Sequence, residues 1–203
     1  MTIHLENLRP RDFGRAIDFA IRGMNFKDFC SGKISTALYG RYAFYHELER
    51  ATEVIAAYDG DRLVGVLLAA LQGETPSYGS FWRRLYITGL ELLFSEKFDT
   101  AADPYKKANK RMLEVYNFSE RSDGEINFLA VDPAMQKCGI GSLLLAELSR
   151  RQKGKRLHLF TDSKCNWIFY ERKGFSRREQ KKIELSIHDE KIPMTCYLYA
   201  KTM

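Results

Sequence analysis

The sequence is poor in the patterns that build metal sites and disulfide frameworks. It has four cysteines, and no two of them are spaced as in a zinc site or a redox pair: Cys30, Cys138, Cys165 and Cys196. The four histidines are equally scattered. We therefore expect reduced thiols, no disulfide framework and no metal.

Long apolar segments are lacking as well. The longest apolar run, from Val64 to Leu71, is far too short to span a bilayer, and the charged N-terminal residues do not resemble a signal peptide. With 45% hydrophobic and 29% charged residues, the composition is that of a soluble globular protein. The sequence thus predicts a cytoplasmic protein with no membrane partner.

Positive charge is concentrated in one segment. From Arg150 to Glu184 there are twelve Lys or Arg and four Asp or Glu, whereas the whole chain carries a net charge of +6. Such a segment could bind nucleic acid, attract a phosphorylated coenzyme, or simply be solvated. Because no helix-turn-helix, RNA-recognition or zinc-finger pattern accompanies it, we predict no nucleic-acid partner.

Hydrophobic periodicity predicts a mixture of helices and strands. Strand patterns at 53–58 and 62–71 flank Asp59-Gly60, a strong hairpin signal. A region at about 74–123 then has helical spacing, and Asp103-Pro104 within it has the form of a helix start. We expect a single domain over residues 1–203 with a helical insertion at about 74–123.

The pattern after Gly124 is strand, glycine loop, helix, strand, helix and a final hairpin. The strand at 125–131 has almost no polar interior, which is typical of a central strand. The hairpin is predicted from Arg177–Ile187 and Met194–Lys201, with a turn at His188–Pro193.

The most informative segment is the loop Gln136-Lys137-Cys138-Gly139-Ile140-Gly141, which leads into a leucine-rich helix. Amides in the first turn of a helix have no helical partner and lie at the positive end of the helix dipole. Glycines let an anion approach them closely. The loop therefore predicts a phosphate-binding site, and an ordinary glycine-rich turn is the alternative.

Two common nucleotide motifs do not fit this loop. A dinucleotide fingerprint needs glycine or alanine where Leu144 stands. The phosphate loop of nucleoside triphosphatases needs a glycine followed, after four intervening residues, by Gly-Lys-Ser/Thr, and that string is absent from the sequence.

The loop fits the pattern Gln/Arg-x-x-Gly-x-Gly/Ala, and Trp167 to Phe175 fits aromatic-Tyr-x-x-x-Gly-Phe. Both strings, at this separation, resemble the GNAT superfamily of acetyl-coenzyme A-dependent N-acetyltransferases, over nearly the whole chain apart from the insertion. The resemblance implies an α/β (α+β) fold with a mixed, mostly antiparallel sheet of six to seven strands, flanked by helices, the insertion preceding the central strand. It implies acetyl-CoA as co-substrate and a primary amine of a small molecule or a protein as acceptor.

The resemblance also implies which residues hold the coenzyme. The backbone of Leu129, Ala130 and Val131 would pair with the pantetheine arm. Asn166 would contact the coenzyme in place of a family asparagine, since the family's position is Ser163 here. The pyrophosphate would bind the loop residues Gln136, Lys137, Cys138, Gly139, Ile140, Gly141 and Ser142.

Two residues are candidates for the chemistry. Tyr170 stands where the family places the general acid that protonates the departing thiolate. Glu125, eleven residues before Gln136, resembles the glutamate of the histone-acetyltransferase branch and is the candidate general base. The structural alternatives are a core tyrosine and a solvated glutamate.

A non-catalytic acyl-CoA sensor or interaction module would carry the same motif strings, so the sequence leaves this second function open. It also leaves open whether the chain forms a homodimer. No motif identifies the acceptor.

Overall fold

The computed structural model describes residues 2–23, 33–187 and 190–203. Its contacts divide the chain into two compact units. The first contains Met1–Ile87 and Ile126–Lys153, and the second contains Thr88–Glu125 and Gly154–Met203.

The first unit is built from strands with helices on both faces. Its elements in chain order are β1 (Ile3–Glu6), η1 (Pro10–Asp12), α1 (Phe13–Gly23), α2 (Lys33–Arg50), β2 (Glu53–Asp59), β3 (Arg62–Leu71), the start of α3, most of β4, η3 (Pro133–Met135) and α4 (Ile140–Arg151). The predicted hairpin is confirmed: β2 and β3 pair antiparallel, and Gly60 in their turn has φ 57°.

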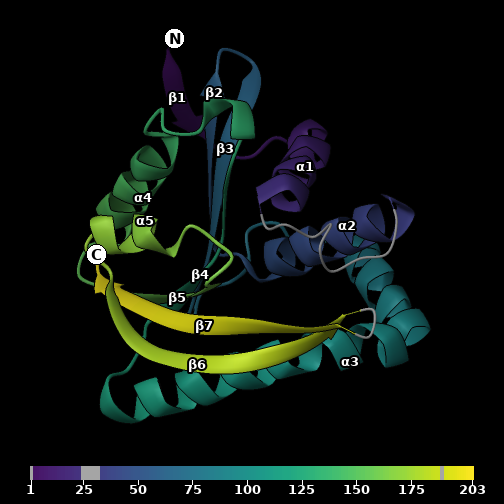
Figure 1. Cartoon of the computed structure of the whole chain (residues 1–203). Helices are drawn as coiled ribbons and strands as arrows, with labels where there is room; N and C mark the ends of the chain where they lie inside the picture. Colours follow the sequence, from purple (N-terminus) through teal and green to yellow (C-terminus); the bar gives the residue numbers. More distant parts are fainter. Residues whose placement is uncertain (1, 24–32, 188–189) are drawn as a thin grey trace. The chain divides into compact units, whose positions relative to one another are not determined.

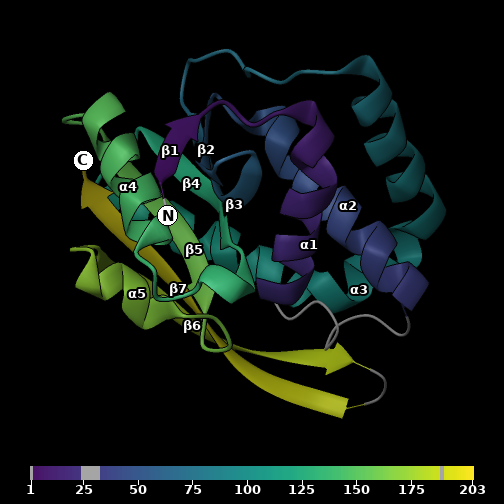
Figure 2. The same cartoon turned by 90° about the horizontal axis from the view of Figure 1, so that it is seen from above.

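Helices α1 and α2 lie side by side on one face of β2 and β3, and α4 covers the other face (Figures 1 and 2). Alternation along β3 explains this arrangement, because successive strand residues point to opposite faces. Val66 belongs to the core under α1 and α2, whereas its neighbour Gly65 faces Ile140 and Leu144 of α4. Phe44 of α2 packs edge-on against Phe128 of β4, with ring centroids 5.5 Å apart.

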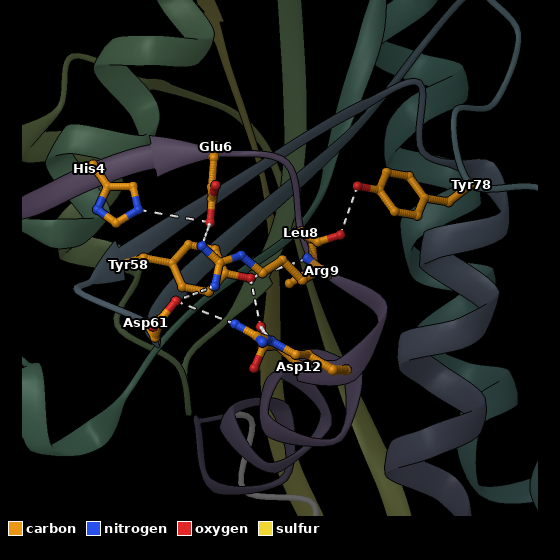
Figure 3. Close-up of polar contacts among 9 residues, drawn as sticks. His4, Glu6, Leu8, Arg9, Asp12, Tyr58, Asp61 and Tyr78 are labelled. Carbon is orange, nitrogen blue, oxygen red and sulfur yellow. Dashed lines mark hydrogen bonds and ion pairs between the residues drawn. The ribbon is translucent and has the colours of Figure 1, made fainter.

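A polar cluster joins the N-terminal segment to the β2–β3 hairpin (Figure 3). The buried hydroxyl of Tyr58 donates to the Asp12 carboxylate at 2.9 Å and accepts from the Arg9 amide at 3.2 Å. The Arg9 guanidinium lies 4.6 Å from the centre of the Tyr58 ring and donates to Asp61 at 2.7 Å. Burial, reinforced by the hydrogen bond to Asp12 and only partly offset by the hydrogen bond from the Arg9 amide, raises the pKa of Tyr58 to about 12, so the hydroxyl stays a donor at neutral pH.

The second unit contains most of α3 (Phe81–Ser119), the first residues of β4 (Gly124–Val131), and the C-terminal elements. These are β5 (Arg156–Asp162), α5 (Trp167–Arg172), β6 (Ser176–Ile187) and β7 (Glu190–Thr202). Strand β7 pairs antiparallel with both β5 and β6. Alternation along β7 sends Leu198 into a cluster with Met112 of α3, while the Tyr197 ring packs at a tilt against Trp167 of α5.

Hydrogen bonding orders the strands β1-β2-β3-β4-β5-β7-β6, with β4 contributing residues to both units. Strands β4 and β5 are parallel, whereas the pairs β1–β2, β2–β3, β5–β7 and β6–β7 are antiparallel. The predicted mixed, mostly antiparallel sheet of six to seven strands flanked by helices is therefore confirmed, with β4 in the middle of the order. Within the described part of the chain, no helix is long and apolar enough to cross a membrane.

Two predicted boundaries are wrong. The region 74–123 holds one helix, α3, which continues through Pro104 instead of beginning there. Proline is favoured at a helix start but is also found inside long helices, so the Asp103-Pro104 signal is ambiguous. Strand β7 begins at Glu190, and Pro193 pairs with Glu184 where a turn was expected. Cys30 and residues 188–189 of the predicted turn lie outside the described residues.

Candidate coenzyme and catalytic site

The predicted phosphate loop joins β4 to α4 in the first unit, and its residues 136–139 are exposed. Two residues of the loop have left-handed backbone, Lys137 with φ 65° and Gly139 with φ 80°. Between them the Cys138 amide donates to the Met135 carbonyl at 3.4 Å. The loop thus has a defined conformation that turns the chain into α4.

The N-terminal end of α4 has backbone amides without a helical partner. The Leu143 amide donates to the Gly139 carbonyl at 3.0 Å, and the amides of Ile140, Gly141 and Ser142 precede this bond. No side chain caps this end of the helix. A Cβ built on Gly139 would have no atom within 4 Å, which leaves room for a ligand beside the backbone. These amides lie at the positive end of the helix dipole, where an anion is stabilised.

A buried carboxylate, Asp132, fixes the chain where it leaves β4. Its Oδ2 accepts from Arg15 of α1 at 3.0 Å and from Arg62 of β3 at 2.8 Å, and its Oδ1 accepts from the Ala134 amide at 3.0 Å. Burial alone would raise the pKa of Asp132, but the hydrogen bonds from Arg62, Ala134 and Arg15 outweigh it and hold that pKa below its ordinary value. Asp132 is therefore ionised at neutral pH.

The other predicted coenzyme residues of the first unit lie on β4 and at the end of η3. Ala130 is buried, whereas Leu129 and Val131 on the opposite face of the strand are partly exposed. Gln136 closes η3, and its amide lies 3.5 Å from the Pro133 carbonyl. The structure thus brings the strand 129–131 and the loop 136–142 together in one unit, while their contacts with a coenzyme stay a prediction.

The remaining predicted residues belong to the second unit. Glu125 lies at the start of β4, in register with His158 of the parallel strand β5. Asn166 immediately precedes α5, is exposed, and its side chain makes no capping hydrogen bond to that helix. Tyr170 lies within α5, and its ring packs against Phe175 at a centroid distance of 5.8 Å.

The Tyr170 hydroxyl has a raised pKa. Burial, followed by the neighbouring Cys165 thiol, raises the pKa of the Tyr170 hydroxyl above its ordinary value of 10. The hydroxyl is therefore protonated throughout the neutral range. That is the state required of a general acid, and an inert core tyrosine would share it.

A network around Arg177 fixes α5 on β7. The guanidinium lies 4.7 Å from the centre of the Tyr197 ring and 5.0 Å from that of Trp167. It donates to the Tyr199 hydroxyl at 3.0 Å and to Glu171 at 2.7 Å, and the Tyr199 hydroxyl in turn donates to Glu171 at 2.8 Å. Since Trp167 and Glu171 both belong to α5, the network sets the position of the helix that carries Tyr170.

Sequence reasoning did not identify Asp132 or Arg177. The Asp132-Pro133 dipeptide was a usable signal for the first, because aspartate before proline commonly opens a helical turn. No local pattern marks Arg177, whose aromatic partners lie on other elements. Among the described residues, no group of three or more His, Cys, Asp or Glu could hold a metal ion.

Comparison with known proteins finds a family model that matches part of the chain. Residues 108–177, which include parts of both units, match the family model of the acetyltransferase (GNAT) domain. A search of curated proteins found no match.

Solved structures share the fold at low sequence identity. A Corynebacterium glutamicum protein described as histone acetyltransferase HPA2 and related acetyltransferase is 14% identical with a TM-score of 0.57, over 100% of this chain and 98% of the other. The PaiA N-acetyltransferase of Thermoplasma acidophilum, in complex with coenzyme A, is 13% identical with a TM-score of 0.55, over 100% of both chains. A GNAT-family acetyltransferase of Streptococcus pneumoniae is 15% identical with a TM-score of 0.53, again over 100% of both. Residues 108–177, which contain both motif strings, are thus similar to the acetyltransferase (GNAT) domain, and the solved acetyltransferase structures share the fold along the length of the chain.

Proposed function

We propose that this protein transfers the acetyl group of acetyl-CoA to a primary amine of a small molecule or a protein, by direct attack of the amine on the thioester. The observation that carries the proposal is the start of α4, where the amides are uncapped and the backbone of Gly139 is open, because such a helix end suits an anion such as the coenzyme's pyrophosphate. Coenzyme A bound to the Thermoplasma acidophilum relative supports this choice of ligand.

The remaining coenzyme contacts follow from the family resemblance. The backbone of Leu129, Ala130 and Val131 pairs with the pantetheine arm as an added strand would, and Asn166 contributes a polar contact. The positive segment from Arg150 to Glu184 attracts the coenzyme's phosphates and does not serve nucleic acid. We further propose that residues 1–203 form a single acetyltransferase domain of the cytoplasm that needs no metal.

Three groups divide the chemistry. Glu125 removes the proton of the acceptor's ammonium, directly or through water, so that the amine can attack. A backbone N–H between Leu129 and Val131 donates to the oxyanion that forms. Tyr170 then gives its proton to the departing thiolate; its hydroxyl carries that proton at neutral pH. The roles of Glu125 and Tyr170 rest on their places in the family motifs.

The first test is ligand-dependent thermal stability. Acetyl-CoA at a hundred times its dissociation constant should stabilise the fold by about 2.7 kcal/mol, which raises Tm by roughly 5–11 °C for a chain of this size. NAD and ATP at the same concentration should leave Tm unchanged. A folded, ligand-free preparation whose Tm does not respond to acetyl-CoA would refute the proposal.

The loop itself is tested by a matched pair of variants. Gly139→Val places a branched side chain at φ 80°, in the space assigned to the pyrophosphate, and should abolish coenzyme binding. Cys138→Ala, one residue away and equally exposed, should bind coenzyme normally. Mass spectrometry of an amine panel incubated with acetyl-CoA then tests turnover. If wild type binds coenzyme but acetylates no amine, the chain is a non-catalytic acyl-CoA-binding module.

A further inference from the structure

Asp132 is an ionised carboxylate whose side chain is only 3% exposed. Burying such a charge is unfavourable unless hydrogen bonds and opposite charges surround it. No step of the proposed reaction uses Asp132, which leaves its burial to be explained by something other than acid–base chemistry. Its contacts provide that explanation.

The two carboxylate oxygens have separate partners. Oδ2 binds the framework, accepting from Arg15 of α1 at 3.0 Å and from Arg62 of β3 at 2.8 Å. Oδ1 binds the start of the loop, accepting from the Ala134 amide at 3.0 Å. The Asp132 amide also donates to the Val64 carbonyl of β3 at 2.9 Å. One residue therefore ties two elements of the first unit to the chain that leads to the phosphate loop.

The hydrogen bonds continue from Asp132 toward α4. The Met135 amide donates to the Asp132 carbonyl at 2.8 Å, and the Cys138 amide to the Met135 carbonyl at 3.4 Å. Gly139, whose carbonyl accepts from the Leu143 amide of α4, follows directly. A shift of Asp132 would consequently move the amides of α4, and hydrogen bonds weaken steeply once their distance or angle departs from the optimum.

We propose that Asp132 is a positioning residue for the coenzyme loop, and that Arg15 and Arg62 act on coenzyme binding through it. This inference rests on the proposed function, because it takes the loop to be the pyrophosphate site. It assigns a task to two arginines that lie far from the loop in sequence. It also distinguishes them from direct phosphate ligands, which would act on the coenzyme independently of Asp132.

The experiment compares two acetyl donors, one with the pyrophosphate and one without it, in a pair of matched variants. Asp132→Asn removes the charge that holds both arginines. Glu53→Gln is the control, because Glu53 is also a carboxylate with two partners in the first unit, Arg151 at 3.1 Å and Gln152 at 2.7 Å, and neither partner belongs to the loop. Coenzyme A affinity is measured by calorimetry, and kcat/KM is measured with acetyl-CoA and with acetyl-pantetheine, which lacks the pyrophosphate.

In Asp132→Asn, the dissociation constant for coenzyme A and kcat/KM for acetyl-CoA should each worsen by about 10-fold to 100-fold. Acetyl-pantetheine should be used as efficiently as by wild type, and Glu53→Gln should resemble wild type with both donors. Equal losses with both donors, or an unchanged affinity for coenzyme A, would overturn the inference. A wild type that binds no coenzyme A would instead overturn the proposed function.

A double-mutant cycle tests the assignment of Arg62. If Arg62 acts through Asp132, Arg62→Gln and Asp132→Asn together should weaken coenzyme A binding no more than Asp132→Asn alone. Arg62→Lys, which keeps the charge, should recover part of the affinity. Additive losses in the double variant would show that Arg62 contacts the phosphates itself, contrary to the inference.

Discussion

Replacing Gly65 by alanine should force the N-terminal end of α4 away from β3. A Cβ at this position would lie 2.7 Å from Cγ2 of Ile140 and 3.1 Å from Cδ1 of Leu144. Both side chains are buried, at 2% and 0% exposure, so neither can move aside into solvent. The first distance is far below a normal carbon–carbon contact of about 3.5–4.0 Å, and the helix itself must shift.

The expected loss of folding stability in Gly65→Ala follows from two opposing effects. Overpacking of a core costs about 1–3 kcal/mol, and alanine restores about 0.4–1 kcal/mol by restricting the unfolded chain. The net loss of about 1–2 kcal/mol corresponds to a Tm lower by roughly 2–8 °C. Since Ile140 is the first residue of α4, coenzyme affinity should fall in the same variant.

Gly14→Ala is the matched control, measured by the same thermal melts and calorimetry. Gly14 lies in α1, and a Cβ there would have no atom within 4 Å. This variant should gain about 0.4–1 kcal/mol and bind coenzyme normally. If Gly65→Ala melts as high as Gly14→Ala, the close approach of α4 to β3 is not what selects glycine at position 65.

Three further variants test the chemistry and the electrostatics. Tyr170→Phe should lower kcat by about 10²–10⁴ with little change in coenzyme affinity. The loss of kcat should shrink above about pH 8.5, where a thiolate can leave unprotonated. If the variant reacts at the wild-type rate while the chemical step is rate-limiting, the hydroxyl is structural. Glu125→Gln should depress kcat/KM mainly on the low-pH side, where the acceptor holds its proton, and a uniform loss across pH would argue against a base. Hydrogen bonds from Arg150 and Arg151 lower the pKa of Glu147 to about 2 from 4.5. Because this pKa is lower in the folded protein than in the unfolded chain, Glu147→Gln should lower Tm above about pH 4.5. The decrease should correspond to about 0.3–1 kcal/mol of stability. The difference in Tm between variant and wild type should vanish as the pH falls toward 2.

The phosphate loop could be predicted from the sequence because its backbone conformation favours glycine at particular positions. Gly139 adopts φ 80°, a left-handed conformation that favours glycine. The requirement is therefore visible in the sequence as a glycine at that position. The anchor of that loop could not be predicted in the same way. Arg15 and Arg62 lie 117 and 70 residues from Asp132, and nothing near either arginine indicates its partner. Local patterns therefore identified the glycine loop, whereas the side chains that hold it in place could be recognised only from the fold.

The same distinction accounts for the insertion. Residues 74–123 were recognised as helical from their spacing, yet their division into two helices at Asp103-Pro104 was wrong. Proline suits the first turn of a helix, whereas in the interior it removes a hydrogen bond and clashes with the preceding turn, at a cost of about 3 kcal/mol. The local preference therefore favoured a helix start at a residue that lies inside α3. The start of α3 has a tertiary cause instead, because the Glu49 carboxylate of α2 accepts from the Ser80 amide at 3.0 Å and from Arg83 at 2.7 Å.

The left-handed backbone of Lys137 bears on how fast an anion can associate. A residue other than glycine at φ 65° is strained by roughly 1–2 kcal/mol, and the folded chain holds Lys137 there. The entropy of ordering the loop is consequently lost during folding and not during the encounter with ligand. The amides of α4 are already oriented when the anion arrives. Association should then proceed in one kinetic phase whose rate is proportional to ligand concentration, without the plateau that a slow loop rearrangement would impose.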